Sequence, residues 1–147
     1  MWAATGKGGG ASSRPTGPET PGVKFAVARR ILIVEDELLV ALDAEATLQD
    51  AGHEVVGIAA SAPQALALME SSEPDVVLLD IYLNGPQDGI EVAQQVRARS
   101  TAKIVFLTAN ADLLQMPRVR ELGTFEVVSK PFEAEELLLA VQRAVNS

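Results

Sequence analysis

The chain has 147 residues, of which 48% are hydrophobic and 22% charged, and its formal net charge is -8 at pH 7. That length allows one ordinary domain and a short extra segment, but not two full domains. The absence of cysteine excludes disulfides, thiolate zinc sites and cysteine nucleophiles, and the single histidine excludes a histidine-rich metal site. Because no apolar run approaches the ~20 residues that cross a bilayer, and no signal-peptide core begins the chain, we expect a cytoplasmic protein.

The first 28 residues differ in composition from the rest. They contain six of the eleven glycines and three of the eight prolines, and almost no apolar side chain lies between positions 6 and 22. Such a segment cannot bury enough surface to offset its ordering entropy, so we expect a flexible tail over 1–28. The formal charge is +4 over residues 1–30 and -12 over residues 31–147. This acidic body argues against nucleic-acid binding, which requires a basic face.

From residue 31 onward, short apolar runs alternate with segments of helical periodicity. The run 31–34 (ILIV) is continuous and rich in β-branched residues, which is typical of a strand buried on both faces. A helix over 38–51 follows, then a strand over 54–59, and Ser61 caps a helix that ends near Ser72. His53 lies in the turn between the first helix and the second strand, where we expect it to face solvent.

The second half of the chain continues the alternation. Residues 76–79 (VVLL) predict a third buried strand, and a loop rich in turn-forming residues follows it. Pro117 weakens the helical pattern of the segment in which it lies. Further helices are expected at about 90–99, 112–122 and 133–145, and further strands at 104–107 and 125–129.

Five strands that alternate with five helices predict an α/β fold with a parallel sheet covered by helices on both faces. We expect a doubly wound, flavodoxin-like sheet with strand order 2-1-3-4-5. No G-x-G-x-x-G or P-loop sequence follows the first strand, which argues against the nucleotide-binding versions of this architecture.

Four of the five predicted strands end in a polar group that could bind or react. Glu35 and Asp36 follow the first strand, Asp80 ends the third, Thr108 the fourth, and Lys130 follows the fifth. Each residue alone has an ordinary explanation as a turn residue, a cap or a surface charge. In an open parallel sheet, however, sites form at the carboxyl ends of the strands, so these side chains are expected to lie together.

The chemistry of this set favours phosphoryl transfer. Three carboxylates in one crevice repel one another unless a proton or a cation neutralises them. Oxygen ligands without histidine or cysteine suit Mg²⁺. Lys130 offers a positive charge and Thr108 a hydroxyl, which together could stabilise a phosphoryl group on a nucleophilic aspartate.

These residues lie in segments that resemble the receiver domain of response regulators in bacterial two-component signalling. The resemblance covers residues 29–147, and its motifs occur in the family's order and spacing. The matching segments are Ile31–Glu37 (ILIVEDE), Asp75–Asp80 (DVVLLD), Asp88-Gly89, Phe106–Ala109 (FLTA) and Lys130–Phe132 (KPF).

The resemblance implies a role for each position. Asp80 matches the aspartate that a partner histidine kinase or phosphotransfer protein phosphorylates. Asp36, with Glu35 beside it, matches the acid pair that holds Mg²⁺, and Tyr82 occupies the position whose backbone carbonyl also binds the metal. Thr108 matches the switch hydroxyl that moves to hydrogen-bond the phosphoryl group.

Lys130 matches the lysine that pairs with the phosphoryl group, and the bond between Lys130 and Pro131 is of the kind that is cis in this family. The sequence also departs from the family pattern. Val127 stands where the switch aromatic usually lies and Phe125 is two positions earlier, so we expect the coupling between hydroxyl and aromatic to be absent or altered. The loop after Asp80 is one residue longer than its commonest form.

We therefore expect a stand-alone receiver, not an enzyme beyond phosphoryl transfer to itself and loss of that group. Its expected partners are a kinase or phosphotransfer protein, a downstream protein, and a second copy bound through the fourth helix, fifth strand and fifth helix. The alternative is a receiver fold that binds proteins independently of phosphorylation. A Mg²⁺-dependent phosphohydrolase is disfavoured, because such enzymes commonly need a second acid at the position of Tyr82.

Overall fold

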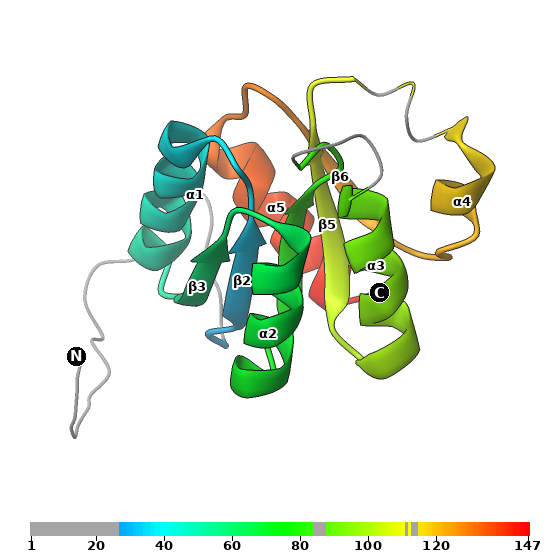
Figure 1. Cartoon of the computed structure of the whole chain (residues 1–147). Helices are drawn as coiled ribbons and strands as arrows, with labels where there is room; N and C mark the ends of the chain where they lie inside the picture. Colours follow the sequence, from blue (N-terminus) through cyan, green and yellow to red (C-terminus); the bar gives the residue numbers. More distant parts are fainter. Residues whose placement is uncertain (1–26, 84–87, 111, 113–114) are drawn as a thin grey trace.

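A computed structural model describes residues 27–83, 88–110, 112 and 115–147, so the predicted tail lies almost wholly outside the described residues (Figure 1). The strands are β2 (Arg30–Val34), β3 (Glu54–Ala59), β4 (Val76–Asp80), β5 (Lys103–Thr108) and β6 (Glu126–Ser129). The helices are α1 (Leu38–Asp50), α2 (Ala62–Ser72), α3 (Asp88–Arg99), α4 (Pro117–Arg120) and α5 (Ala134–Val145).

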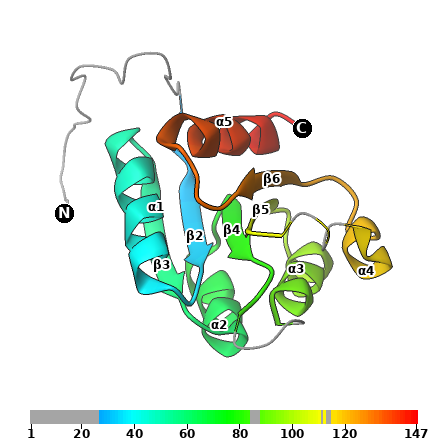
Figure 2. The same cartoon turned by 90° about the horizontal axis from the view of Figure 1, so that it is seen from above.

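The five strands pair in parallel in the order β3-β2-β4-β5-β6, which confirms the predicted order 2-1-3-4-5. Helices α1 and α5 cover one face of the sheet, and α2 and α3 cover the other (Figure 2). All five residues of β4 are buried, because β2 and β5 flank it and helices cover both faces. Within the described residues, no helix has the length and apolarity needed to span a membrane.

Successive residues of each strand face opposite sides of the sheet, which creates two apolar cores. Leu32 and Val34 of β2 pack in the core under α2 and α3, whereas Ile31 and Ile33 pack in the core under α1 and α5. Continuous apolar runs therefore occur because both faces of the strands are buried. This burial fixes the strands, and with them the residues at their carboxyl ends.

Helix α4 is shorter than the predicted helix over 112–122. Among the described residues of that range, only Pro117–Arg120 form an α-helix. Met116 has φ -64° and ψ 136°, the extended conformation that a following proline favours. Pro117 then takes the first helical position, where its missing N–H is not needed, so the proline begins the helix instead of weakening its middle.

The prediction that His53 faces solvent is wrong. Its side chain is buried, and its Nδ1 accepts a hydrogen bond of 3.0 Å from the backbone N–H of Arg29. Burial lowers the pKa of His53 to about 4, and the positive charge of Arg29 adds to the effect. His53 therefore joins the start of β2 to the start of β3 as a neutral side chain.

The residues that α1 buries are mostly small. Ala41, Ala44 and Leu48 face the sheet, whereas Leu38 and Leu39 are 64% and 81% exposed. The first turn of α1 therefore presents large apolar side chains to solvent, directly after the acidic residues that follow β2.

Candidate functional site

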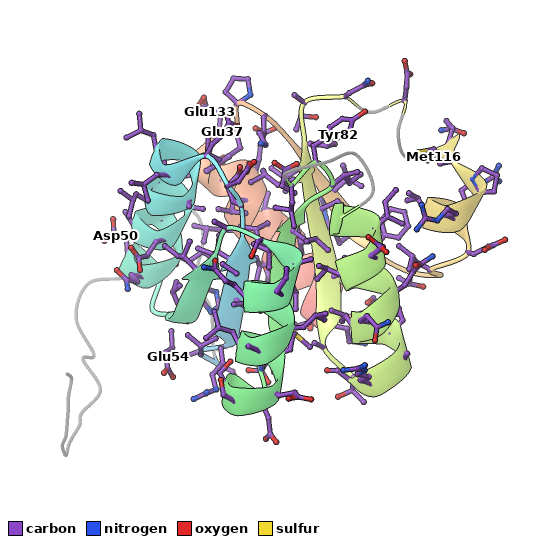
Figure 3. The ribbon with its side chains drawn as sticks, viewed as in Figure 1. Glu37, Asp50, Glu54, Tyr82, Met116 and Glu133 are labelled. Carbon is purple, nitrogen blue, oxygen red and sulfur yellow. The ribbon has the colours of Figure 1, made fainter. Side chains whose placement is uncertain are left out.

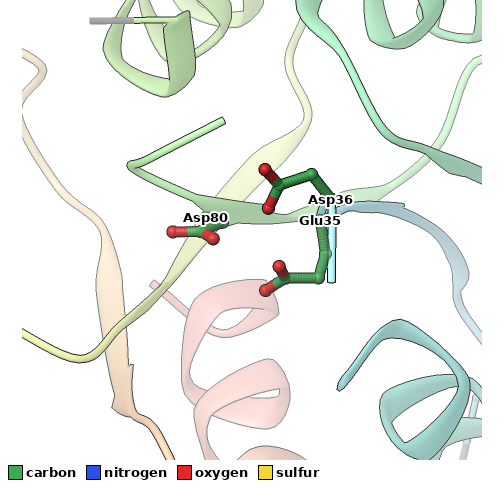
Figure 4. Close-up of side chains that lie close together, drawn as sticks. All are labelled: Glu35, Asp36 and Asp80. Atoms are coloured by element: carbon green, nitrogen blue, oxygen red, sulfur yellow. The ribbon is translucent and has the colours of Figure 1, made fainter. Parts of the chain in front are cut away.

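Three carboxylates meet at the carboxyl end of the sheet. Glu35 and Asp36 follow β2, Asp80 ends the adjacent β4, and one oxygen of each lies within 4.8 Å of the others (Figure 4). Glu35 and Asp80 are only 2% and 5% exposed, whereas Asp36 is exposed. The predicted acidic cluster thus forms because neighbouring parallel strands end at one edge.

Burial makes this cluster electrostatically unfavourable without a cation. It raises the pKa of Glu35 to about 7, despite the opposing effects of Lys130 and of the backbone N–H of Glu37, and the nearby charge of Asp80 adds to the rise. A metal ion bound by these carboxylate oxygens would favour the ionised form of the three side chains. The donor set, which contains only oxygen, fits Mg²⁺.

Lys130 lies among these acids. Its Nζ is 2.9 Å from Oε1 of Glu35, 3.0 Å from Oδ2 of Asp80 and 3.1 Å from Oε1 of Glu37. Burial alone would lower the pKa of Lys130, but hydrogen bonds with the three carboxylates raise it above its usual value. Lys130 is thus a permanently charged donor directed at Asp80. The peptide bond between Lys130 and Pro131 is cis, as predicted.

Thr108 lies at the same edge, with its hydroxyl bonded to the adjoining loop. Leu107 is the register partner of Asp80, so Thr108 lies one residue beyond that partner on β5. Its Oγ1 accepts a hydrogen bond of 3.1 Å from the N–H of Asn110 and donates one of 3.2 Å to the carbonyl of Asn110. Two hydrogen bonds therefore tie the Thr108 hydroxyl to Asn110 at the start of this loop.

The chain after β4 is fixed close to Asp80. The N–H of Tyr82 donates a hydrogen bond of 3.0 Å to Oδ1 of Asp80, while the Tyr82 side chain is 43% exposed. Gly89 returns to this point, and its N–H donates to the carbonyl of Ile81 at 3.1 Å. A Cβ at Gly89 would overlap with the backbone oxygens of Asp80 and Ile81, so the close approach requires glycine.

Phe125 makes the aromatic contact at the fifth strand. Val127 is the register partner of Phe106, and Phe125 packs edge-to-face on Phe106 with ring centroids 5.0 Å apart. The partly buried Phe125 ring thus packs against the core on the α2–α3 side, two residues before the position where the resemblance placed the switch aromatic.

Sequence analysis missed one member of the site. Glu37 follows the acid pair directly and lies within the matching segment, but no role was predicted for it. The structure pairs its carboxylate with Lys130 across 93 positions of sequence. Its place next to Glu35 and Asp36 was the only available signal.

Comparison with known proteins identifies relatives of the chain. The family model of the response regulator receiver domain matches residues 31–142. The transcriptional regulatory protein PdtaR of Mycobacterium tuberculosis is 37% identical over 131 residues, which are 89% of this chain and 63% of PdtaR. The chain therefore spans less than two thirds of that relative.

Two solved structures share the fold. The response regulator PhyR from Brucella abortus is 35% identical with a TM-score of 0.71, over 82% of this chain and 49% of PhyR. The signal receiver domain of a modulated diguanylate cyclase from Desulfovibrio desulfuricans G20 is 29% identical with a TM-score of 0.75, over 82% of this chain and 95% of that domain.

Proposed function

The chain belongs to the response regulator receiver domain family of two-component signalling, and we propose that it is a phosphorylation-dependent switch that accepts a phosphoryl group on Asp80. The observation that carries this proposal is the placement of Asp80, which is buried at a strand end, hydrogen-bonded to Lys130 at 3.0 Å and grouped with Glu35 and Asp36. We assign the receiver domain to residues 29–147 and place the protein in the cytoplasm.

Asp80 acts as the nucleophile in this proposal. A carboxylate oxygen of Asp80 forms a bond to phosphorus as the bond between phosphorus and the imidazole nitrogen of the donor breaks, and the donor histidine leaves with that electron pair. Lys130 offsets the negative charge on the phosphoryl oxygens from its position beside Oδ2. The N–H of Tyr82 holds the other carboxylate oxygen and fixes the orientation of the nucleophile.

Glu35, Asp36 and Asp80, together with the backbone carbonyl of Tyr82, are the residues that would hold Mg²⁺. The ion would supply positive charge to offset the charges of the carboxylates and the phosphoryl group. The raised pKa of Glu35 supports this assignment, because it shows that the ionised form of this buried carboxylate is disfavoured without a metal ion. A bound cation would stabilise that ionised form.

Thr108 is proposed to transmit the signal. A phosphoryl group on Asp80 offers acceptor oxygens to a hydroxyl that otherwise bonds with Asn110. If Thr108 moves to that group, both of its bonds to Asn110 are lost, and the loop after β5 is released to take a second conformation. A downstream protein or a second copy would then bind α4, β6 and α5, where Leu139 is an exposed apolar side chain.

A protein donor explains the exposed apolar residues beside the site. Leu38 and Leu39 project from the first turn of α1, and a histidine kinase or histidine phosphotransfer protein that reaches Asp80 could cover them. A groove joins this surface to the site lysine. Its lining residues are Leu39, Val40, Asp43, Lys130, Pro131 and Phe132.

A phosphorylation-independent interaction module is the second candidate function. Two features favour it: Val127 stands in place of the switch aromatic, and Phe125 packs against the core. In that case, partner affinity would be the same with and without beryllofluoride and Mg²⁺. A gain in affinity with beryllofluoride would instead support the switch.

Phosphotransfer from a phosphorylated histidine kinase tests the main proposal. We expect the wild type and Asp50→Asn to accept the group equally, because Asp50 is an exposed acid at the end of α1, remote from the site (Figure 3). Asp80→Asn should not accept it. Labelling of Asp80→Asn at the wild-type level would show that the assignment is wrong.

A further inference from the structure

Lys130 is surrounded by acceptors before any phosphoryl group arrives. Its Nζ lies within 3.1 Å of carboxylate oxygens of three residues: it donates hydrogen bonds to Glu37 and Asp80 and forms an ion pair with Glu35. Because an ammonium group has only three N–H donors, a phosphoryl group on Asp80 competes with these acceptors for Lys130. We infer that Glu37 is a positioning residue that holds Lys130 beside Asp80 until the phosphoryl group displaces it, an inference that rests on the proposed function.

Exposure decides which contact is lost. The side chain of Glu35 is 0% exposed and that of Asp80 is 7% exposed, so separating either from Lys130 would leave a buried charge without its partner. The side chain of Glu37 is 65% exposed, and water can solvate its carboxylate as soon as the contact breaks. Glu37 is therefore the acceptor that is exchanged at least cost.

The backbone holds Glu37 in place for this role. Its N–H donates a hydrogen bond of 2.9 Å to Oε2 of Glu35, which ties the start of α1 to the acidic cluster. Its side chain forms no capping hydrogen bond with α1 among the described residues, although Glu37 occupies the N-cap position. The carboxylate of Glu37 thus accepts a hydrogen bond from Lys130 instead of capping the helix. Figure 3 shows Glu37 at the same end of the molecule as Tyr82.

Competition for Lys130 has a measurable consequence. Glu37 and a phosphoryl group on Asp80 are acceptors for the same ammonium group, so neutralising Glu37 favours the phosphorylated state. An exposed ion pair contributes modestly, which sets the expected gain in affinity for a phosphoryl mimic at about two- to five-fold. The gain in affinity for the mimic must depend on Lys130. A gain that came only from removing a negative charge near the site would not depend on Lys130.

Titration calorimetry with beryllofluoride and Mg²⁺ tests the competition. We expect Glu37→Gln to bind the mimic about two- to five-fold more tightly than the wild type. Asp43→Asn is the matched control, because Asp43 lines the groove beside Lys130 and no ion pair joins the two among the described residues. The control should bind as the wild type does. An unchanged affinity for Glu37→Gln, or an equal gain for Asp43→Asn, would overturn the inference.

A double-mutant cycle of Glu37→Gln with Lys130→Met tests the contact by itself. The stability of each variant is measured by urea unfolding in the absence of the mimic. We expect the effect of Glu37→Gln on stability to disappear in the Lys130→Met background. Additive effects would overturn the inference, even if beryllofluoride binding were normal. If the wild type bound no beryllofluoride while the cycle showed coupling, the contact would stand, but the proposed function would fail and the role of Glu37 in it would fail too.

Discussion

Lys130→Met should destabilise the metal-free protein, and the loss should grow above neutral pH. The substitution keeps the apolar stem of the side chain and removes the cation that lies 2.9 Å from Glu35 and 3.0 Å from Asp80. Breaking a buried ion pair by removing one partner costs roughly 3–5 kcal/mol. The pair with Glu37, which is 65% exposed, adds no more than about 1 kcal/mol. Because Lys130 keeps some exposure, we expect a loss of about 3 kcal/mol in the free energy of unfolding near pH 8.5.

The pH dependence follows from Glu35. Burial raises its pKa to about 7 in the folded protein, and removing Lys130 raises this pKa further, because Lys130 opposes the rise. An acid with a raised folded-state pKa lowers stability as pH climbs from its unfolded pKa, about 4.5, through its folded pKa. The difference between wild type and variant should therefore be smaller near pH 6, where Glu35 takes up a proton and the lost pair with Asp80 still contributes, and should grow above about pH 7.

Urea unfolding followed by circular dichroism, with a chelator present, measures both values. Lys103→Met is the matched control, because Lys103 begins β5 at the opposite end of the sheet, and its effect should stay within about 0.5 kcal/mol. Equal stability of Lys130→Met and wild type near pH 8.5 would refute the claim that Lys130 neutralises buried carboxylates.

Three further substitutions test the fold around the site. Gly89→Ala forces a Cβ into the backbone of Asp80 and Ile81 and should cost about 1–3 kcal/mol in urea unfolding; stability equal to wild type would contradict that close approach. As pH falls from about 6.5 to 4, the wild type should lose up to about 3 kcal/mol of stability, because the buried His53 must take up a proton on unfolding. His53→Asn keeps an acceptor for the N–H of Arg29 but cannot titrate, so the variant should not show this loss. Parallel pH profiles would show that His53 does not titrate as its burial implies. Leu78→Ala in the fully buried β4 should cost about 2–5 kcal/mol, whereas Leu139→Ala on the surface of α5 should cost far less.

The sheet could be predicted because both of its faces are buried. The runs ILIV, VVLL and IVFL within β2, β4 and β5 are continuously apolar, and the rules for parallel crossovers leave few arrangements of such short strands with intervening helices. The length of α4 could not be predicted, because Pro117 is compatible with either a weakened helix or the first residue of one. His53 was misplaced because its acceptor role depends on Arg29, which tertiary structure brings near.

The site was predictable where it consists of strand ends and not where it depends on contacts between loops. Glu35, Asp36 and Asp80 meet because strand order and register bring their backbones together. The contact of Glu37 with Lys130 depends instead on how two loops 93 positions apart approach each other, and side-chain patterns carry no signal of that geometry. The hydrogen bonds of Thr108 with Asn110 are local, but they compete with many alternatives in a turn.

The identity of the phosphorylated residue tests the central claim most directly. In this experiment a histidine kinase is supplied as the phosphoryl donor, and the protein is then treated with borohydride, which reduces an aspartyl phosphate to homoserine. Mass spectrometry then locates the changed residue. The account predicts homoserine at position 80 in the wild type and no homoserine in Asp80→Asn. Homoserine at another aspartate, or a phosphoryl group that resists borohydride, would contradict it.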